Sequence, residues 1–436
     1  MKHLLLLSAA LLAAPALTPA AAQSVAITNA RLVIGDGSAP IEGGTVVIRN
    51  GRVVAAGKAV AVPQGVETID AGGRYVTPGI VAGFTRMGIV EVDGVGQTND
   101  AGASGSPFHA SIDIAPAVNP RTSSIPLNRA EGVTRAIVAP ENRGSIFAGL
   151  GAVIDLGADR TPISTARAFQ FMEYGEGGAG AAGGSRPAAI AMFKNALFQA
   201  RSYARNPNGY ADQGKDALLN RADAEALGAV VTGKMPLLIH VERASDMLAL
   251  IDLRRDYPAI RMVFVGASEG WTVAAELAAA RIPVIASALN DLPESFEALA
   301  ATQSNIGRMT AAGVQVGIGT INDNEARQAR LEKQYAGNLV ALTRVPGATG
   351  LDWNAAFAAI TSIPAEAIGL GGDIGSLRPG RQGDVVIWSG DPLELDAAAL
   401  SVWISGVKQP LQTRQALLLK RYLQPQEGAL PKAYER

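Results

Sequence analysis

The sequence predicts an α/β protein: a (β/α)8 TIM-like barrel with a small composite β-sandwich domain built from both chain ends. Three observations lead to this prediction. Both ends of the chain are rich in β-branched residues and turn signals, whereas the middle alternates between strand-like and helix-like segments. The chain has 436 residues, of which 48% are hydrophobic, so it can fill one large core and one smaller core.

Residues 24–75 are expected to form the first part of the sandwich. Runs of β-branched residues are separated there by Asn-Gly and Gly-Gly pairs. The pair Asn50-Gly51 lies between VVIR and RVVAAG, and this pattern is typical of a β-hairpin with a two-residue turn.

Residues 76–370 are expected to form the barrel, because strand-like and helix-like segments alternate along them. Repetition of this kind is typical of parallel βαβ units, and about eight such units close a barrel. Six or seven strands can be placed from the pattern. Beyond the strand that begins at residue 76, strands are expected at 133–140, 236–241, 260–265, 282–287 and 314–320, and helices at 123–132, 190–206, 216–234, 245–257, 271–281, 294–313, 324–345 and 352–369.

Residues 371–436 return to strand-like composition and are expected to complete the sandwich by pairing with the first part. Two glycine-rich stretches, 101–107 and 175–187, interrupt the barrel region. They are predicted to be surface loops on the top of the barrel, without a core of their own.

The N-terminus has the features of a signal peptide. Residues 4–12 are apolar, and three alanines precede Gln23, as at a cleavage site for export. A membrane anchor is the alternative, but the apolar run is short and is followed by Pro15 and Pro19. We expect residues 1–22 to be removed and the protein to be periplasmic or secreted.

Composition limits the partners. The formal net charge is −1, which predicts no attraction to nucleic acid or to an anionic membrane. The chain has no cysteine, so it offers neither a disulfide framework nor a thiol nucleophile. No later run is long and apolar enough for a membrane span, and a small-molecule ligand is the expected partner. The sequence leaves a homo-oligomer possible.

The segment VTPGIVAGFTRMG, residues 76–88, carries a family likeness. Together with PLLIHVERASDM and the C-terminal stretch, it resembles the amidohydrolase superfamily, in particular the imidazolonepropionase-like branch. The C-terminal stretch is the most specific part, and its matching positions are Ile360, Thr361, Pro364, Ala365, Leu370, Gly375, Ser376, Leu377, Pro379, Gly380 and Asp384.

The resemblance implies hydrolysis of non-peptide C–N bonds in a small cyclic amide. It also implies a divalent metal such as zinc, which polarises a carbonyl and supplies hydroxide. In the family, two histidines after the first barrel strand bind this metal. Here those two positions are Phe84 and Arg86, and the acid that precedes them in the family is replaced by Ala82.

Three further ligand positions can be compared. After the strand PLLIHV the family has a histidine, and His240 matches it. The next histidine position falls on Gly266, with Glu269 close by, and the aspartate position falls on Thr320, with Asp323 three residues on. His240 is therefore the only matching ligand, and the metal set is unknown from the sequence.

Candidate catalytic residues are His240, Glu269 and Asp323, which lie near predicted strand ends, where barrel active sites form. Each has a structural alternative: a hydrogen-bonded core histidine for His240, and carboxylates at helix N-termini for Glu269 and Asp323. Arg86 and Phe84 are candidate binding residues and would make the pocket partly apolar and positively charged. An anionic ligand with an apolar body is expected from these two side chains.

Arg243 is a further candidate for binding an anionic group, with a surface ion pair as the alternative. His109 lies in a predicted loop, and its role is open. The sequence GASEG around Ser268 follows a strand and precedes a helix, as in a nucleophile elbow. No histidine follows Ser268 in the chain, so the chain order of such a triad is absent.

The sequence leaves three functions open. The first is the C–N hydrolysis that the resemblance implies, and the second is metal-free hydrolysis through His240 with Glu269 or Asp323. The third is a catalytically inactive descendant that binds a small ligand or a partner in the old pocket. The shortage of histidines favours the third as far as metal chemistry is concerned, because a catalytic zinc needs three or four ligands. The extent of the family likeness favours the first.

Overall fold

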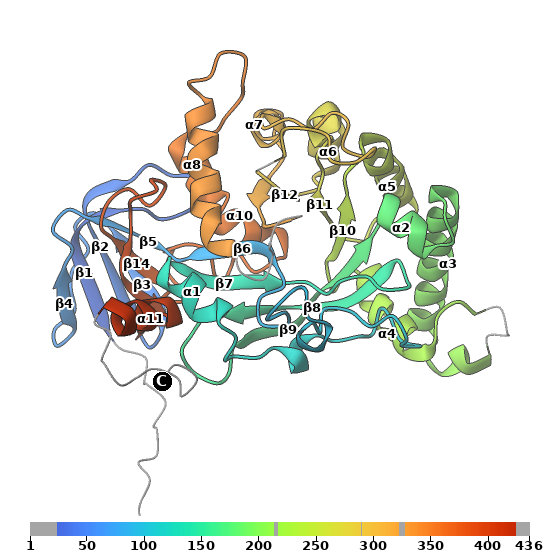
Figure 1. Ribbon diagram of the computed structural model, residues 1–436, viewed down its shortest axis with the longest axis horizontal. Helices are drawn as coiled ribbons and strands as arrows, with labels where there is room; N and C mark the ends of the chain where they lie inside the picture. The colour runs from blue at the N-terminus through green and yellow to red at the C-terminus, as the bar shows by residue number, and fades with distance from the viewer. Residues whose placement is uncertain (1–23, 213–216, 289, 322–327, 424–436) are drawn as a thin grey trace, which may run out of the picture.

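The computed structural model describes residues 24–212, 217–288, 290–321 and 328–423. The chain forms an eight-stranded barrel sheet, a second eight-stranded sheet at one end of it, and helices around the barrel (Figure 1). The expected barrel with a small composite β domain is confirmed. The predicted signal peptide and Asp323 lie outside the described residues.

The barrel sheet follows the order of the chain, because each strand pairs with the next one from β6 to β13. The two end strands meet at Thr320, whose backbone nitrogen and hydroxyl both donate to the carbonyl oxygen of Phe84, at 3.2 and 2.8 Å. The sheet is therefore almost closed. Its strands are β6 (Ile80–Thr85), β7 (Val133–Val138), β8 (Phe147–Asp155), β9 (Ile163–Glu173), β10 (Leu237–Val241), β11 (Met262–Gly266), β12 (Val284–Ala286) and β13 (Val316–Ile318).

One barrel strand departs from the expected parallel repeat: β8 runs antiparallel to both β7 and β9. The connections explain this departure. Residues 139–146 and 156–162 are too few for a crossover between parallel strands, which takes a dozen residues or more, but they suffice for hairpins. The prediction of parallel units throughout was wrong here, and β8 and β9 are strands that the sequence pattern did not locate.

The second sheet combines both ends of the chain. Strand β5 is hydrogen-bonded to β1 on one side and to β14 on the other, so the C-terminal strands continue the N-terminal sheet. Gly79 separates β5 of this sheet from β6 of the barrel. The strands are β1 (Val25–Leu32), β2 (Ile41–Arg49), β3 (Arg52–Gly57), β4 (Glu67–Asp70), β5 (Tyr75–Pro78), β14 (Val385–Trp388), β15 (Ala399–Ile404) and β16 (Val407–Lys408).

A buried ion pair joins the two sheets. Arg135 on β7 donates from Nε to Asp384, next to β14, at 2.7 Å, and from Nη2 to the hydroxyl of Ser405 at 2.7 Å. Arg135 is only 3% exposed. Burial would lower its pKa, but the attraction of Asp384 and the hydrogen bond to it outweigh burial and raise the pKa. The guanidinium therefore stays charged and holds the small sheet against the barrel.

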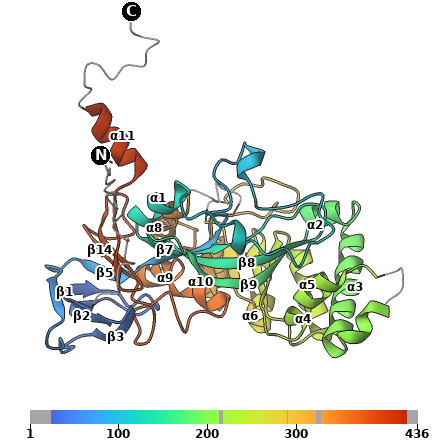
Figure 2. The same ribbon diagram turned by 90° about the horizontal axis from the view of Figure 1, so that it is seen from below.

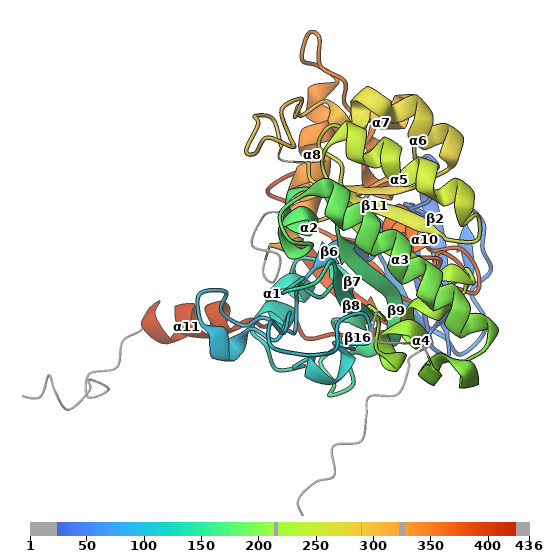
Figure 3. The same cartoon turned by 90° about the vertical axis from the view of Figure 1, so that its right-hand side faces the viewer.

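The helices cover the outside of the barrel, and Figure 3 shows α3, α5 and α6 side by side on one flank. The helices are α1 (Ser124–Ala130), α2 (Glu176–Ala181), α3 (Arg186–Arg205), α4 (Arg221–Val231), α5 (Ala244–Asp256), α6 (Ala274–Ala280), α7 (Asn305–Ala311), α8 (Glu332–Leu342), α9 (Trp353–Ala358), α10 (Ser362–Ala367) and α11 (Arg414–Leu423). Short 3-10 turns lie at Gly96–Thr98, Ala115–Ala117, Asn208–Asp212, Gly270–Val273 and Ala329–Leu331.

Two local predictions were wrong. A helix was expected over residues 294–313, but only α7 at its end is helical, and the preceding residues form turns anchored by hydrogen bonds to Trp271 and Glu269. The glycine-rich stretch 175–187 was expected to be a loop, but it contains α2, in which Gly178 and Ala179 are buried. Small residues allow this short helix to pack closely against the end of β9.

The interior of the barrel is filled by apolar side chains from alternate positions of the strands, including Val81, Phe169, Leu238, Val263 and Ile285. This packing leaves room for a cavity only above the filled layer, at the strand ends. Within the described residues, no helix has both the length and the hydropathy to cross a membrane.

Candidate functional site

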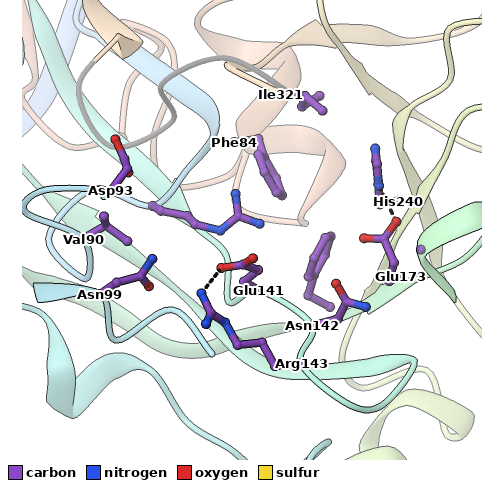
Figure 4. Close-up of a pocket in the computed structure, with 13 residues that line it drawn as sticks. Phe84, Val90, Asp93, Asn99, Glu141, Asn142, Arg143, Glu173, His240 and Ile321 are labelled. Carbon is purple, nitrogen blue, oxygen red and sulfur yellow. Dashed lines mark hydrogen bonds and ion pairs between the residues drawn. The ribbon is translucent and has the colours of Figure 1, made fainter. Parts of the chain in front are cut away.

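A cavity of about 710 Å³ opens at the carboxyl ends of the parallel barrel strands (Figure 4). This is the end at which barrel proteins place their active sites. Its side chains come from β6, β9 and β10 and from the loops after β6, β7 and β13. The lining residues are Phe84, Arg86, Val90, Asp93, Asn99, Glu141, Asn142, Arg143, Phe171, Glu173, Gly177, His240 and Ile321.

His240 is held between two carboxylates at the wall of this cavity. Its Nδ1 lies 2.6 Å from Oε1 of Glu173, and its Nε2 lies 2.8 Å from Oε1 of Glu242. Strand register produces this arrangement, because His240 on β10 is paired with Glu173 on β9. Glu242 follows two residues after His240 and therefore projects from the same side of the chain. We call these three residues the histidine clamp.

The histidine clamp continues into a hydrogen-bond network across the next two strand ends. Oε2 of Glu242 accepts from the backbone nitrogen of Ser268, after β11, at 2.8 Å. The hydroxyl of Ser268 accepts from Nδ2 of Asn290, after β12, at 2.8 Å. Ser268 is 2% exposed and does not line the cavity, so the nucleophile-elbow interpretation gains no support from its position.

Gly266 is the position at which Glu242 is accommodated. Its φ is +91°, a conformation that favours glycine, and a Cβ placed there would overlap the Glu242 carboxylate. A side chain at residue 266 and the carboxylate of Glu242 are therefore mutually exclusive in this conformation. The family resemblance implies a histidine at residue 266. In this chain the carboxylate of Glu242 occupies the space that such a side chain would fill.

The contacts within the histidine clamp shift the pKa values of His240 and Glu242. Burial alone would lower the pKa of His240, but attraction by Glu173 and the hydrogen bonds to Glu173 and Glu242 raise it well above 6.5. Burial would raise the pKa of Glu242, but the hydrogen bond and charge of His240 and the hydrogen bonds from Ser268 lower it. His240 is thus an imidazolium at neutral pH, and each ring nitrogen donates to one carboxylate.

The two positions after β6 hold an aromatic ring and a guanidinium. The ring of Phe84 packs against that of Phe171 with 5.5 Å between the centroids, and only 2% of Phe84 is exposed. The guanidinium of Arg86 lies 5.5 Å from the centroid of the Phe84 ring. Both candidate binding residues therefore reach the cavity, Phe84 as part of its apolar wall and Arg86 as a cation.

Arg243 and Glu269 do not line the cavity. Arg243 is exposed at the start of α5. The carboxylate of Glu269 accepts from the backbone nitrogens of Ala244, at 3.0 Å, and Ala300, at 3.1 Å. Glu269 therefore sits at the N-terminus of α5, where a carboxylate is favoured by the helix dipole.

His109 belongs to another part of the molecule. Its backbone nitrogen donates to Asp223 at 3.1 Å, and it borders a separate cavity of about 140 Å³. The loop that carries it is fixed by Asp223, which also accepts from the backbone and hydroxyl of Ser111.

Several residues of the cavity were not singled out from the sequence. Glu173 is the most important one, and it ends strand β9, whose last residues FQFME have aromatic side chains at alternate positions. That alternation could have revealed β9 and its terminal acid. Glu141 and Arg143 pair at 3.0 Å on the loop after β7 and carried no comparable signal.

The charges that line the cavity balance. Arg86, Arg143 and protonated His240 face Asp93, Glu141 and Glu173. The expectation of a positively charged pocket was therefore wrong, because it counted Arg86 without the carboxylates that tertiary structure brings beside it.

The described residues do not match the needs of a catalytic metal. Phe84, Arg86 and Gly266 offer no ligand atom, and Thr320 is hydrogen-bonded to a backbone carbonyl. His240 has no ring nitrogen free of a carboxylate partner. Among the residues that the structure describes, no group of three His, Asp or Glu side chains is arranged to hold a metal ion.

Comparisons with solved structures agree on the fold. An amidohydrolase from Thermotoga maritima superposes with a TM-score of 0.75, at 23% identity, over 88% of this chain and 99% of that one. A zinc-bound adenosine deaminase from Xanthomonas campestris superposes with a TM-score of 0.52, at 18% identity, over 93% and 98%.

Sequence comparisons point the same way. The profile of the amidohydrolase family Amidohydro_3 matches residues 304–408. The amidohydrolase tasK of Hapsidospora irregularis is 26% identical over 382 residues, which are 80% of this chain and 38% of tasK, so this chain spans little more than a third of that protein. The imidazolonepropionase of Acidiphilium cryptum is 25% identical over 391 residues, 81% of this chain and 89% of that protein. This chain is therefore similar in sequence to amidohydrolases and has the fold of solved amidohydrolase structures.

Proposed function

We propose that this chain binds a small organic molecule in the barrel cavity without a transition-metal ion, as a superfamily member with a degenerate metal site. The observation that carries the proposal is the histidine clamp. A metal ligand must be a neutral imidazole with a free lone pair, whereas both nitrogens of His240 are hydrogen-bonded to carboxylates and the ring is protonated.

Because His240 is positively charged, the two carboxylates of the clamp need no metal ion between them. Glu173 and Glu242 would repel each other without a cation between them, and the imidazolium supplies that cation at 2.6 and 2.8 Å. A divalent ion bound by His240 would have to displace a ring proton from its hydrogen bond to a carboxylate. Arg86, which also lines the cavity, further disfavours a second cation there.

The side chains that line the cavity indicate what kind of ligand it can bind. Phe84, Phe171 and Ile321 offer an apolar surface, and Asn99 and Asn142 offer amide groups. Because the cationic and anionic side chains balance, a neutral or zwitterionic molecule fits better than a multiply charged anion. The volume of about 710 Å³ suits a molecule of metabolite or drug size.

Hydrolysis of a C–N bond in a small cyclic amide is the second candidate. It is supported by the position of Glu173 and His240 at the cavity wall and by the names of the matched relatives, an amidohydrolase and an imidazolonepropionase. The geometry supports it less well. His240 already carries its proton at neutral pH, so it cannot act as the general base that activates water.

Metal analysis and ligand screening test the first candidate. After dialysis, the purified protein should contain far less than one equivalent of Zn, Fe or Mn per chain. A thermal-shift screen of neutral and zwitterionic metabolites should yield binders whose effect is lost in Asn142→Trp, which fills the cavity. Asn206→Trp, at an exposed position after α3, is the matched control. Retention of a stoichiometric metal, or binding that survives Asn142→Trp, would contradict the proposal.

Hydrolase assays separate the two candidates. If lactams, hydantoins or aminoacyl compounds are turned over, His240→Ala and Glu173→Gln should each abolish the activity, and Glu269→Gln should not. Absence of turnover together with saturable binding supports the binding function alone.

The export of the chain is part of the same proposal and is supported by the N-terminal residues 1–22. N-terminal sequencing of protein recovered from the periplasm or medium should begin near Gln23. Retention of Met1 would contradict cleavage.

A further inference from the structure

The last described helix, α11, exposes nearly all of its surface. None of its ten residues is buried. Figures 2 and 3 show it standing away from both sheets, at the end of the chain segment that follows β16. A ten-residue helix without packing partners is only marginally stable in water, and the residues that the structure describes do not cover its apolar side chains.

Most of the large apolar residues of α11 gather on one side. At 3.6 residues per turn, Leu418, Leu419, Tyr422 and Leu423 fall within an arc of roughly 140°, in which Gln415 is the one polar residue. Their exposed fractions are 37%, 61%, 68% and 70%, and Leu417, which is 50% exposed, projects to the opposite side. Four large exposed apolar groups within one arc of so short a helix form an apolar face.

The other side of α11 carries its cations together with Leu417. Arg414 and Arg421 lie next to one edge of the apolar face, and Lys420 lies toward the other edge. Residues 397–423 contain no Asp or Glu, although they contain four Lys or Arg residues: Lys408, Arg414, Lys420 and Arg421. The net charge of −1 for the whole chain therefore conceals a local positive charge at this end of the molecule.

We propose that α11 docks on an anionic lipid surface, lying in the plane of the interface with its apolar face in the acyl boundary. Cations on both sides of the apolar face can extend to lipid phosphates while the leucines enter the apolar region. The helix is about 15 Å long by its rise per residue, half the thickness of a bilayer core, so it lies on the surface and does not span. This property is separate from the proposed ligand binding in the barrel cavity.

Vesicle binding tests the proposal. The processed chain beginning at Gln23 is mixed with vesicles of phosphatidylglycerol and phosphatidylethanolamine, or of phosphatidylcholine alone, and co-sedimentation is measured at low and high salt. Binding is expected on the anionic vesicles and should fall with salt. Each cation near the surface contributes about fivefold in affinity, so Lys420→Gln with Arg421→Gln should weaken binding roughly 30-fold.

A second variant, with its own control, tests the contribution of the apolar face to vesicle binding. Leu419→Asp with Leu423→Asp should abolish sedimentation without changing the thermal midpoint, because both side chains are exposed and unpacked. Leu292→Asp, at a residue that is 75% exposed on a distant loop, is the matched control and should bind as the wild type does.

Three results would overturn the proposal. The first is no binding of the unmodified chain to anionic vesicles, and the second is equal binding by the α11 variants. The third is a stable dimer in lipid-free buffer that Leu419→Asp with Leu423→Asp converts to monomer, because the apolar face then belongs to a contact with a second copy of the chain.

Discussion

Replacing Glu242 by glutamine tests the central feature of the cavity, the protonated His240. The substitution keeps the shape of the side chain but removes one of the two negative charges that hold the imidazolium. The amide oxygen can still accept from the backbone of Ser268, and the amide nitrogen then faces Nε2 of His240. His240 is expected to become a neutral ring that donates from Nδ1 to Glu173 and accepts at Nε2.

The size of the effect follows from the contacts. An opposite charge within about 4–6 Å shifts a pKa by roughly 1–3 units, and each unit corresponds to about 1.4 kcal/mol. The pKa of His240 should therefore fall in Glu242→Gln, because burial then favours the neutral ring. The protonated clamp should lose stabilisation on the order of a few kcal/mol.

Histidine-selective ¹⁵N labelling makes the measurement direct. The chain contains three histidines, and only His109 and His240 remain after residues 1–22 are removed. Ring nitrogen shifts followed over pH should show His240 charged well above pH 6.5 in the wild type and neutral at lower pH in Glu242→Gln. Glu269→Gln, whose carboxylate contacts backbone near α5 and not His240, is the control.

The contacts of the histidine clamp also determine whether its contribution to the stability of the fold rises or falls with pH. Because the folded pKa of His240 is raised, its stabilising contribution is full below about pH 6.5 and is lost as pH rises through the folded value. Because the folded pKa of Glu242 is lowered, its contribution is present above about pH 4.5 and is lost as pH falls through the folded value. A wild-type His240 that titrates near 6.5, or that Glu242→Gln leaves unchanged, would refute this account of the clamp.

The remaining predictions concern the packing around the clamp, the joint between the sheets and the metal. Gly266→Ala should destabilise the fold by roughly 2 kcal/mol or more in urea unfolding, because it combines a positive φ with overlap on Glu242; an unchanged midpoint would contradict this. Arg135→Met should cost roughly 3–5 kcal/mol by leaving Asp384 buried without its partner, whereas Arg255→Met, at a side chain 78% exposed, should cost about 0–1 kcal/mol. Dialysis against a chelator should leave the thermal midpoint unchanged, and a drop that zinc restores would show that a metal supports the fold.

The sequence determined the fold largely because its signals are local. Alternating strand and helix patterns, a hairpin turn and the C-terminal positions around Gly375 and Asp384 specify elements and their order without knowledge of contacts. It missed β8 and β9, and it predicted parallel units throughout, because the direction of a strand depends on which neighbour it pairs with. The shortage of histidines was also visible at once, since counting residues requires no geometry.

The composition of the site was decided by tertiary structure. His240 could be identified from the sequence, but Glu173 is 67 residues away and reaches it only through the register of β9 and β10. Glu269 and Arg243 lie near the same strand ends yet point elsewhere, because a position near a strand end does not determine the direction of a side chain.

The sequence by itself determined that this chain has few histidines to offer a metal. The structure alone decided that a carboxylate fills the room at Gly266 and that a protonated histidine lies between two acids. The physical reason is that charge and burial act through distance in space. A pKa or a ligand set depends on partners within a few ångströms, and strand pairing brings such partners together from distant parts of the chain.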